Sequence, residues 1–124
     1  NMVDNSFKPI HFKEGEVIFA ENDPPGSVYL IHKGSVEVSK DVSGNKIVLA
    51  KRQWNEIFGE MALFDNKARS ATVTALEDTW CYELSREMFE KKLEELDPFM
   101  QGVFKTLVNS LRNTTEDITQ IFAS

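Results

Sequence analysis

Cysteine is almost absent from this sequence, in which Cys81 is the single thiol among 124 residues. A lone cysteine cannot form a disulfide within the chain. It lies in the apolar run of residues 80–84 and lacks the cationic neighbours that activate a thiol, so the sequence predicts a buried strand residue. A chain without disulfides suits a reducing compartment, and we expect a cytoplasmic protein.

Long apolar runs and leader sequences are missing as well. No stretch approaches the roughly 20 apolar residues that a helix needs to cross a bilayer. No segment combines a basic start, an apolar middle and a small-residue cleavage site, as a signal peptide does. We therefore expect no membrane association. Hydrophobic residues make up 41% of the chain, which is typical of one globular domain at this length.

Basic residues are too few for a nucleic-acid-binding face. The net charge is −6, from 20 acidic and 14 basic residues, without a cluster of Lys or Arg. We expect no direct contact with nucleic acid. A small anionic ligand is still compatible, because it needs one arginine and some backbone N–H groups. His11 and His32 lack neighbours at metal or catalytic spacing, so the sequence predicts neither a metal site nor an enzyme.

Short apolar segments recur through residues 10–84, with turn residues between them. Several alternate apolar and polar residues with a period of two, as half-buried strands do. The segments are residues 16–20, 27–31, 34–38, 46–50, 71–75 and 79–84, and the clearest turns are 23–26 and 43–45. Many short strands at this spacing predict a β-sandwich or a jelly-roll barrel.

The periodicity becomes helical from Ser85, which is a good N-cap. Asp97 followed by Pro98 predicts the start of a second helix, because proline suits the first helical position. A helix from Pro98 to about Phe122 would be roughly 37 Å long at 1.5 Å per residue. We expect its first half to pack against the barrel. Beyond Leu111 we expect it to run past the barrel and meet its twin in a homodimer.

Residues 58–73 contain the most informative motif. Gly59 and Glu60 stand at the start of a short helical segment, and Arg69 follows beside small residues at the mouth of a strand. Glycine lets the backbone approach a ligand closely. The free N–H groups of a helix start attract an anion, and arginine pairs with phosphate. These parts suit a ligand that carries both a phosphate and a sugar hydroxyl.

This stretch resembles the phosphate-binding cassette of cyclic nucleotide-binding domains, and the resemblance covers nearly the whole chain in order. Residues 12–19 resemble the family's opening strand, and residues 22–38 resemble its next hairpin. The resemblance implies an α+β fold: an antiparallel β jelly-roll barrel with a short cassette helix and C-terminal helices, the last one long. Asn22 and Asn55 stand where the family usually has glycine. Asparagine is the next-best residue at positive φ, so we expect both turns to be kept.

The resemblance also implies a role for each cassette residue. Glu60 would accept a hydrogen bond from the ribose 2′-hydroxyl, and Arg69 would pair with the equatorial phosphate oxygens. Backbone N–H groups of residues 60–63 would face the phosphate. The other expected ligand-binding residues are Gly59, Met61, Ala62, Ser70 and Ala71 in the cassette, with Val38 and Leu49 on the apolar side of the pocket.

Each of these residues also has a plainer explanation. Glu60 could simply balance the helix dipole, and Arg69 could be a solvated side chain at a strand edge. Ser70 could contact the phosphate or a guanine amino group, or could merely be small. Val38 and Leu49 could belong to the core. The combination of Gly59, Glu60 and Arg69 favours the ligand site.

Thr114 and Thr115 refine the expected ligand. Residues 111–116 resemble the part of the long helix in catabolite activator proteins where a Thr-Ser pair, one residue from each subunit, contacts adenine. The adenine amino group is a donor where guanine has an acceptor. The resemblance therefore implies cyclic AMP as the ligand, with cyclic GMP less favoured. Two threonines on a helix surface are the plainer alternative.

We thus expect an N-terminal lead (1–9), a β-barrel with its cassette (10–84) and C-terminal helices (85–124) with a dimerisation helix at 98–122. The expected function is a cyclic nucleotide sensor that signals allosterically through its last helix to a downstream protein or output domain. One alternative is a transcription regulator of the catabolite activator type cut before its DNA-binding domain. Another is a degenerate interaction module that no longer binds ligand.

Overall fold

The computed structural model describes residues 8–63 and 66–123, except for the side chains of residues 62, 63, 111, 112 and 114–123. The strands are β1 (Ile10–Phe12), β2 (Val17–Phe19), β3 (Val28–Lys33), β4 (Val36–Val42), β5 (Asn45–Arg52), β6 (Ile57–Phe58), β7 (Thr72–Ala75) and β8 (Thr79–Leu84). The helices are the 3-10 helix η1 (Glu60–Leu63) and the α-helices α1 (Arg86–Glu94) and α2 (Pro98–Ala123).

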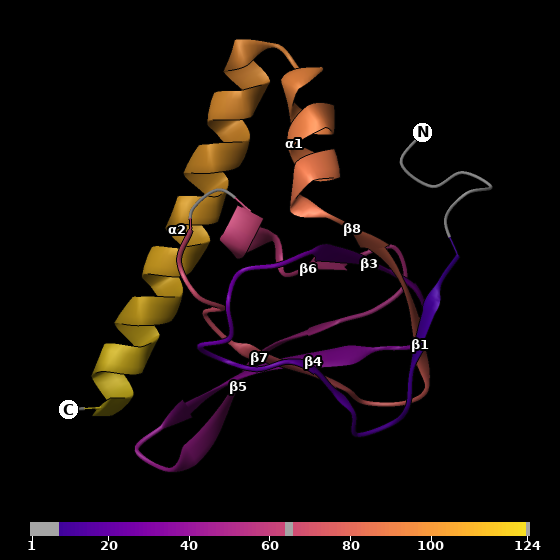
Figure 1. Cartoon of the computed structure of the whole chain (residues 1–124). Helices are drawn as coiled ribbons and strands as arrows, with labels where there is room; N and C mark the ends of the chain where they lie inside the picture. The colour runs from indigo at the N-terminus through magenta and orange to yellow at the C-terminus, as the bar shows by residue number, and fades with distance from the viewer. Residues whose placement is uncertain (1–7, 64–65, 124) are drawn as a thin grey trace.

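The strands form two antiparallel four-stranded sheets, with the orders β1-β8-β3-β6 and β2-β7-β4-β5. Consecutive strands such as β3 and β4, or β7 and β8, belong to different sheets, so the chain passes repeatedly from one layer to the other (Figure 1). This confirms the predicted α+β fold with a jelly-roll arrangement of strands. Strands β1 and β6 are too short to show a period of two, and the sequence segments did not include them.

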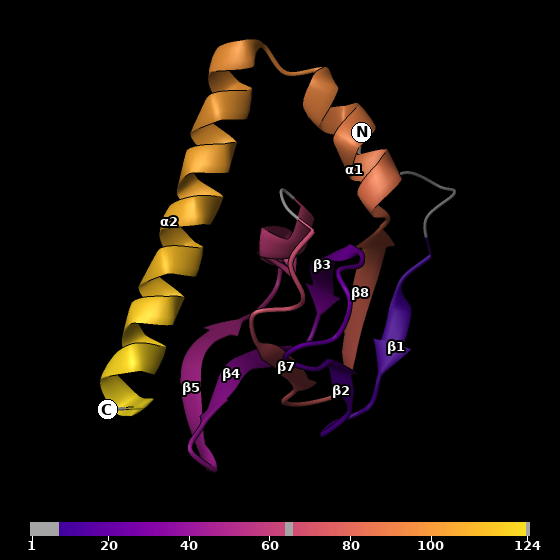
Figure 2. The same cartoon turned by 60° about the vertical axis from the view of Figure 1, so that its left-hand side comes forward.

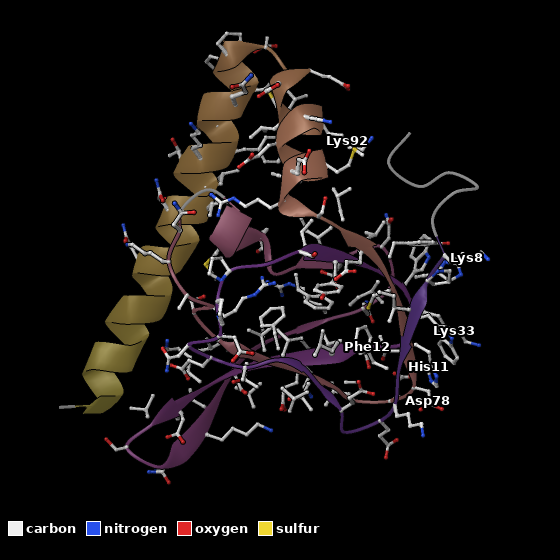
Figure 3. The ribbon with its side chains drawn as sticks, in the orientation of Figure 1. Lys8, His11, Phe12, Lys33, Asp78 and Lys92 are labelled. Carbon is white, nitrogen blue, oxygen red and sulfur yellow. The ribbon has the colours of Figure 1, made fainter. Side chains whose placement is uncertain are left out.

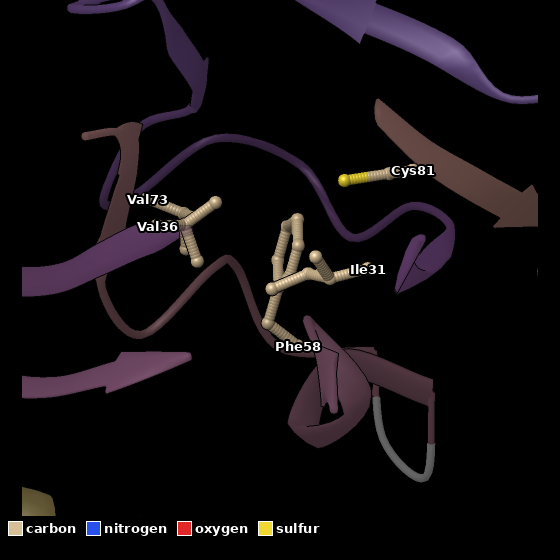
Figure 4. Packing of buried hydrophobic residues seen from close by; sticks show 5 residues of the cluster. All are labelled: Ile31, Val36, Phe58, Val73 and Cys81. Atoms are coloured by element: carbon tan, nitrogen blue, oxygen red, sulfur yellow. The ribbon is translucent and has the colours of Figure 1, made fainter. Parts of the chain in front are cut away.

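The core lies between the two sheets. Its fully buried members are Ile31, Val36, Phe58, Val73 and Cys81, none of them more than 2% exposed (Figure 4). Burying one such aliphatic or aromatic side chain contributes about 1.5–3 kcal/mol to folding. The prediction of a buried strand thiol at Cys81 is confirmed.

Asparagine supplies positive φ at two turns beside the cassette. Asn22 has φ 75° and Asn55 has φ 65°, so both turns are kept, as predicted. The turn predicted at residues 23–26 instead lies three residues earlier, at residues 20–23, where the Asp23 N–H donates to the Ala20 carbonyl at 3.0 Å. The Asp23 carbonyl, which would accept in a turn over residues 23–26, instead accepts from the Arg69 N–H at 2.8 Å.

Both predicted helix starts are confirmed. The Ser85 hydroxyl accepts from the Met88 N–H at 3.2 Å, and the Asp97 carboxylate accepts from the Met100 N–H at 2.9 Å. Each bond satisfies one of the free donors at a helix N-terminus. Within the described part of the chain, no helix has the length and apolar character required to span a bilayer.

Helix α2 runs along one flank of the barrel, with η1 between it and the strands (Figure 2). It contacts η1 and β4, and among its described side chains Val108 alone is buried. The expectation that its first half packs against the barrel is borne out at Val108, which is 5% exposed. Phe99 is 78% exposed and Leu107 57% exposed, so these two apolar side chains lie outside that contact.

Candidate functional site

A cavity lies beside η1, between the cassette and the strands of the second sheet. It brings together residues that are far apart in the sequence. Its lining residues are Phe19, Val38, Arg52, Phe58, Gly59, Glu60, Met61, Arg69, Ser70, Ala71 and Val73. Seven of the predicted site residues are among them: Val38, Gly59, Glu60, Met61, Arg69, Ser70 and Ala71.

Arg69 is the central side chain of this cavity and is only 5% exposed. Its Nη1 donates to the Gly59 carbonyl at 3.0 Å, and its Nη2 donates to the Ser27 carbonyl at 2.8 Å. The guanidinium carbon lies 3.9 Å from the centre of the Phe19 ring, at a distance that permits a cation–π interaction. The expectation of a solvated arginine at a strand edge is therefore excluded.

The charge of Arg69 has no anionic partner among the described residues. None of their ion pairs includes it, and its buried Nε has no hydrogen-bond acceptor within the same part of the chain. Burial lowers the pKa of Arg69, while Tyr29, Asp23 and Glu60 raise it. A buried charge is costly unless it is paired. The arrangement is suited to an external anion that would complete the coordination of the guanidinium.

Two glycines allow Arg69 to occupy this position. A Cβ at Gly59 would lie 2.9 Å from Nη1 of Arg69 and 3.2 Å from the Ser27 carbonyl oxygen. A Cβ at Gly26 would lie 2.9 Å from Nη2 of Arg69. Gly59 also has φ 83°, where an L side chain is strained. The predicted close backbone approach at Gly59 is thus made to the arginine that faces the cavity.

Glu60 begins η1 and is partly buried at the cavity wall. Burial raises the pKa of its carboxyl, and the hydrogen bond from its own backbone N–H and the charges of Arg52 and Arg69 oppose that rise. Glu60 therefore carries a partly desolvated acceptor between two cations. Such a carboxyl can accept a hydrogen bond from a hydroxyl group of a ligand.

The structure describes fewer contacts for the other residues that the sequence predicted at the site. Ser70 donates a long hydrogen bond to the Met61 sulfur at 3.9 Å. The β4–β5 register shifts between the pairs Val38–Ala50 and Ser39–Val48, which leaves Leu49 as the extra residue of a bulge. Ala62 lies in η1, but its side chain is outside the described residues. The side chains of Thr114 and Thr115 in α2 are outside them as well.

Sequence reasoning missed several residues of the cavity. Phe19, Arg52 and Val73 come from three strands, and Phe58 lies within the cassette motif without having been assigned a role. Arg52 is paired with the buried Val36 and so shares its inward face. A charged residue directly before a turn ordinarily indicates solvent exposure, so the sequence carried no signal for Arg52. The aromatic Phe58, next to Gly59, was the one signal available.

The two histidines lie away from this cavity. His11 is exposed and stacks on Trp80 at 4.5 Å between ring centres, and Lys33 lies 5.2 Å from the centre of the same indole ring. Figure 3 shows His11, Lys33 and Asp78 together along one edge of the barrel. His32 is also exposed and meets Tyr82 edge-on. The described residues contain no group of His, Cys, Asp or Glu that could hold a metal ion.

Comparisons with known proteins agree with this geometry. The family model described as "Cyclic nucleotide-binding domain" matches residues 9–95. The chain is 32% identical over 106 residues to the cAMP-dependent protein kinase regulatory subunit of Dictyostelium discoideum, covering 82% of this chain and 32% of that protein. It is 33% identical over 96 residues to the cGMP-dependent protein kinase of Toxoplasma gondii, covering 77% of this chain and 9% of the kinase.

Among solved structures, the cAMP-bound form of the EAL enzyme Bd1971 matches with a TM-score of 0.79 at 32% identity. The match covers 93% of this chain and 32% of that one. The chain thus spans about a third of the length of the regulatory subunit and of the EAL enzyme. The family model matches residues 9–95, and the cavity contains the buried Arg69 with Gly59 packed against it. This chain belongs to the cyclic nucleotide-binding domain family.

Proposed function

We propose that this chain is a regulatory module that binds cyclic AMP and signals through its last helix. The observation that carries the proposal is Arg69, a buried cation whose Nε has no acceptor among the described residues. A singly charged cyclic phosphate supplies the missing acceptors. The same observation argues against a degenerate module, because an unpaired buried charge would be costly to retain without a ligand.

In this proposal each cavity residue has a defined task. Arg69 pairs with the exocyclic phosphate oxygens, and the free N–H groups at the start of η1, at Met61 and Ala62, face the same phosphate. Glu60 accepts from the ribose 2′-hydroxyl. Ser70 and Ala71 leave room beside the arginine, and Val38 and Leu49 cover the apolar side of the ribose and base. Backbone donors and a guanidinium are the groups that proteins ordinarily use to bind phosphate.

Recognition of the base is proposed for the second half of α2. Thr114 and Thr115 of a homodimer would receive the adenine amino group, which favours cyclic AMP over cyclic GMP. Relatives of this chain include a cAMP-dependent and a cGMP-dependent protein, so family membership leaves the base open. The exposed apolar residues Phe99 and Leu107 supply a surface through which two copies of α2 would pair.

The proposed signal passes from the cassette to α2. Because η1 contacts α2, a ligand that tightens η1 also acts on the helix, and ligand affinity and helix position are then coupled. An output domain or a separate downstream protein would read that position. We further propose a cytoplasmic location, in keeping with the single buried thiol.

The test begins with thermal unfolding in the presence of cyclic AMP or cyclic GMP. A ligand that binds only the native state stabilises it by about 2.7 kcal/mol at a concentration of 100 Kd. Calorimetry then compares the wild type with Arg69→Ala and Arg69→Lys. Loss of the buried ion pair weakens binding by about 10²–10⁴-fold. Lys51→Ala, which removes the same charge from an exposed position, is the control; unchanged affinity in Arg69→Ala refutes the phosphate assignment.

The base contact is tested separately by competition between cyclic AMP and cyclic GMP. Thr114→Ala and Thr115→Ala are expected to lower the preference for cyclic AMP while leaving phosphate binding in place. A preference retained in both variants refutes the contact. Light scattering that gives a monomer at all concentrations, with and without ligand, refutes the dimer without affecting the cassette assignment.

A further inference from the structure

Lys40 is a charged residue on the inward side of the barrel. It follows the cavity-lining Val38 by two positions on β4, so the two side chains share a face. The position therefore belongs to the apolar side of the strand. In keeping with this, the Lys40 side chain is only 12% exposed, although it carries a charge. A lysine is rarely buried to this extent without specific partners.

Its partners connect it to the cassette. The Lys40 ammonium donates to the Ser70 carbonyl at 2.7 Å and pairs with the Glu21 carboxylate at 3.1 Å. Ser70 directly follows the arginine of the cavity. The Lys40 ammonium thus holds the backbone at the junction between Arg69 and β7, with a charge-assisted bond of the stronger kind.

Glu21 is itself fixed by the same region. Its N–H donates to the Thr72 hydroxyl at 2.9 Å, and its carboxylate accepts from the Asp41 N–H at 3.1 Å. Glu21 therefore joins the turn after β2 to the start of β7 through its main-chain N–H, and to strand β4 through its carboxylate. Lys40 closes this connection, because it touches both Glu21 and Ser70.

The main chain of Arg69 is bound to the same turn. The Asn22 N–H donates to the Arg69 carbonyl at 2.9 Å, and the Arg69 N–H donates to the Asp23 carbonyl at 2.8 Å. Residues 69 and 70 are thus held at three main-chain groups, two by the turn and one by Lys40. The ion pair between Lys40 and Glu21 connects the turn to the lysine that binds the Ser70 carbonyl. Such over-determination is what fixes a binding group within a fraction of an ångström.

We propose that Lys40 is a positioning residue for the anion site: through Ser70 and Glu21 it sets the backbone from which Arg69 reaches the cyclic phosphate. The inference rests on the proposed function for its ligand. Because Glu21 neutralises the charge of Lys40, the effect is one of geometry and not of general attraction for anions. Loss of Lys40 weakens binding of the phosphate group specifically.

The chain offers a matched control in Lys46. It lies on the neighbouring strand β5 and pairs with Glu37, a carboxylate of a residue that is only 8% exposed. Lys46→Met changes the net charge as Lys40→Met does and also leaves a carboxylate without its lysine. The double variant Lys40→Met/Glu21→Gln removes both charges of the ion pair between Lys40 and Glu21. Lys40→Arg keeps a cation with several donors at the same position.

The experiment measures cyclic AMP affinity by calorimetry in these variants, together with the affinities for the two diastereomers of its cyclic phosphorothioate. Those diastereomers differ only in which exocyclic oxygen is replaced by sulfur. We expect Lys40→Met and the double variant to lose about tenfold in affinity and to bring the diastereomer ratio closer to one. We expect Lys46→Met to change neither and Lys40→Arg to recover most of the affinity.

Three results overturn the proposal. An unchanged diastereomer ratio in Lys40→Met shows that the lysine only stabilises the fold. Full affinity in the double variant shows that the unpaired Glu21 charge, and not lost positioning, weakens the single variant. Equal losses in Lys40→Met and Lys46→Met show a general effect of charge.

A wild-type protein that binds no cyclic nucleotide would refute the proposed function and leave the positioning role to be tested in the ligand-free protein. Hydrogen exchange of the Arg69 and Asn22 amides is then compared with that of Val73 in the core. Faster exchange at the first two in Lys40→Met, but not in Lys46→Met, supports the role. Unchanged exchange overturns it.

Discussion

Arg69 and Gly59 are joined directly, by a hydrogen bond of 3.0 Å from Nη1 to the glycine carbonyl. The two residues lie at the end and the beginning of the cassette. The bond therefore closes the cassette around the cavity, and the guanidinium is held at the cavity wall where the anion is expected. A preformed site of this kind binds with less loss of conformational freedom.

Gly59→Ala tests this closed arrangement. The new methyl group meets Arg69 and the Ser27 carbonyl at φ 83°, so we expect a loss of about 2–5 kcal/mol in stability from strain and overpacking, with weaker ligand binding. Gly44→Ala is the control, since Gly44 has φ 82° but nothing within 4 Å of its added Cβ. Chemical denaturation measures both. Equal losses in the two variants would show that contact with Arg69 contributes nothing.

Glu60→Gln separates stability from binding. Burial raises the pKa of Glu60 above its ordinary value of 4.5 in the folded state. The native protein therefore holds this proton more tightly, and the free energy of unfolding falls as the pH rises from 4.5 through the higher native pKa. Glu60→Gln removes this decline. We expect a higher Tm than wild type at pH 7, together with weaker binding of cyclic AMP.

The measurement is thermal unfolding from pH 4 to pH 8, with affinities for cyclic AMP and its 2′-deoxy analogue. Glu60→Gln should lower the affinity for the ribose form and leave that for the deoxy form nearly unchanged. Glu14→Gln, at an exposed carboxylate, should alter neither quantity. A Glu60→Gln protein that is less stable than wild type at pH 7 contradicts the assignment of burial as the dominant effect.

Cys81 should be inert in the native protein. Burial raises the pKa of its thiol from 9.0 to about 12, which lowers the thiolate fraction at pH 8 roughly a thousandfold, and the thiolate is the reactive form. We expect native protein to react with a disulfide reagent only as fast as it unfolds. Ellman's assay with and without denaturant makes the comparison. A stoichiometric reaction within seconds under native conditions would contradict the buried position.

Leu107→Glu tests the proposed pairing of α2. Leu107 is 57% exposed on that helix, and a carboxylate there would be buried without a partner in a dimer. We expect sedimentation velocity to show a shift from dimer to monomer. Leu76→Glu alters a side chain that is 38% exposed in the connection between β7 and β8 and should leave the dimer intact. A dimer that survives Leu107→Glu must pair through another surface.

Local chemistry explains why so much of the cassette could be predicted. Gly59, Glu60 and Arg69 are identified by residue type and spacing within one short segment, and the structure brings all three to one cavity. Asn22 and Asn55 were assigned to positive φ because few other residues tolerate it. Each of these predictions needed only the residue and its immediate neighbours.

Contacts between residues on different strands of the barrel could not be predicted from the local sequence. Phe19 stacks on Arg69 from a strand fifty positions earlier in the chain, and no local pattern connects the two. Arg52 faces inward because of its register with Val36, and the bulge at Leu49 changes which neighbouring residues share a face. The exposure of Phe99 depends on where the assembled fold places α2, which no local pattern specifies.

Val108 is the one buried side chain among those described on α2, and its position has a mechanical consequence. Val108 meets the cassette side of the barrel, and the fifteen residues from there to Ala123 form an arm of roughly 22 Å at 1.5 Å per residue. A tilt of about 10° at this pivot would carry the C-terminal end by about 4 Å, somewhat less than the rise of about 5.4 Å in one helical turn. A displacement of η1 that tilts α2 is thus enlarged along the length of the helix.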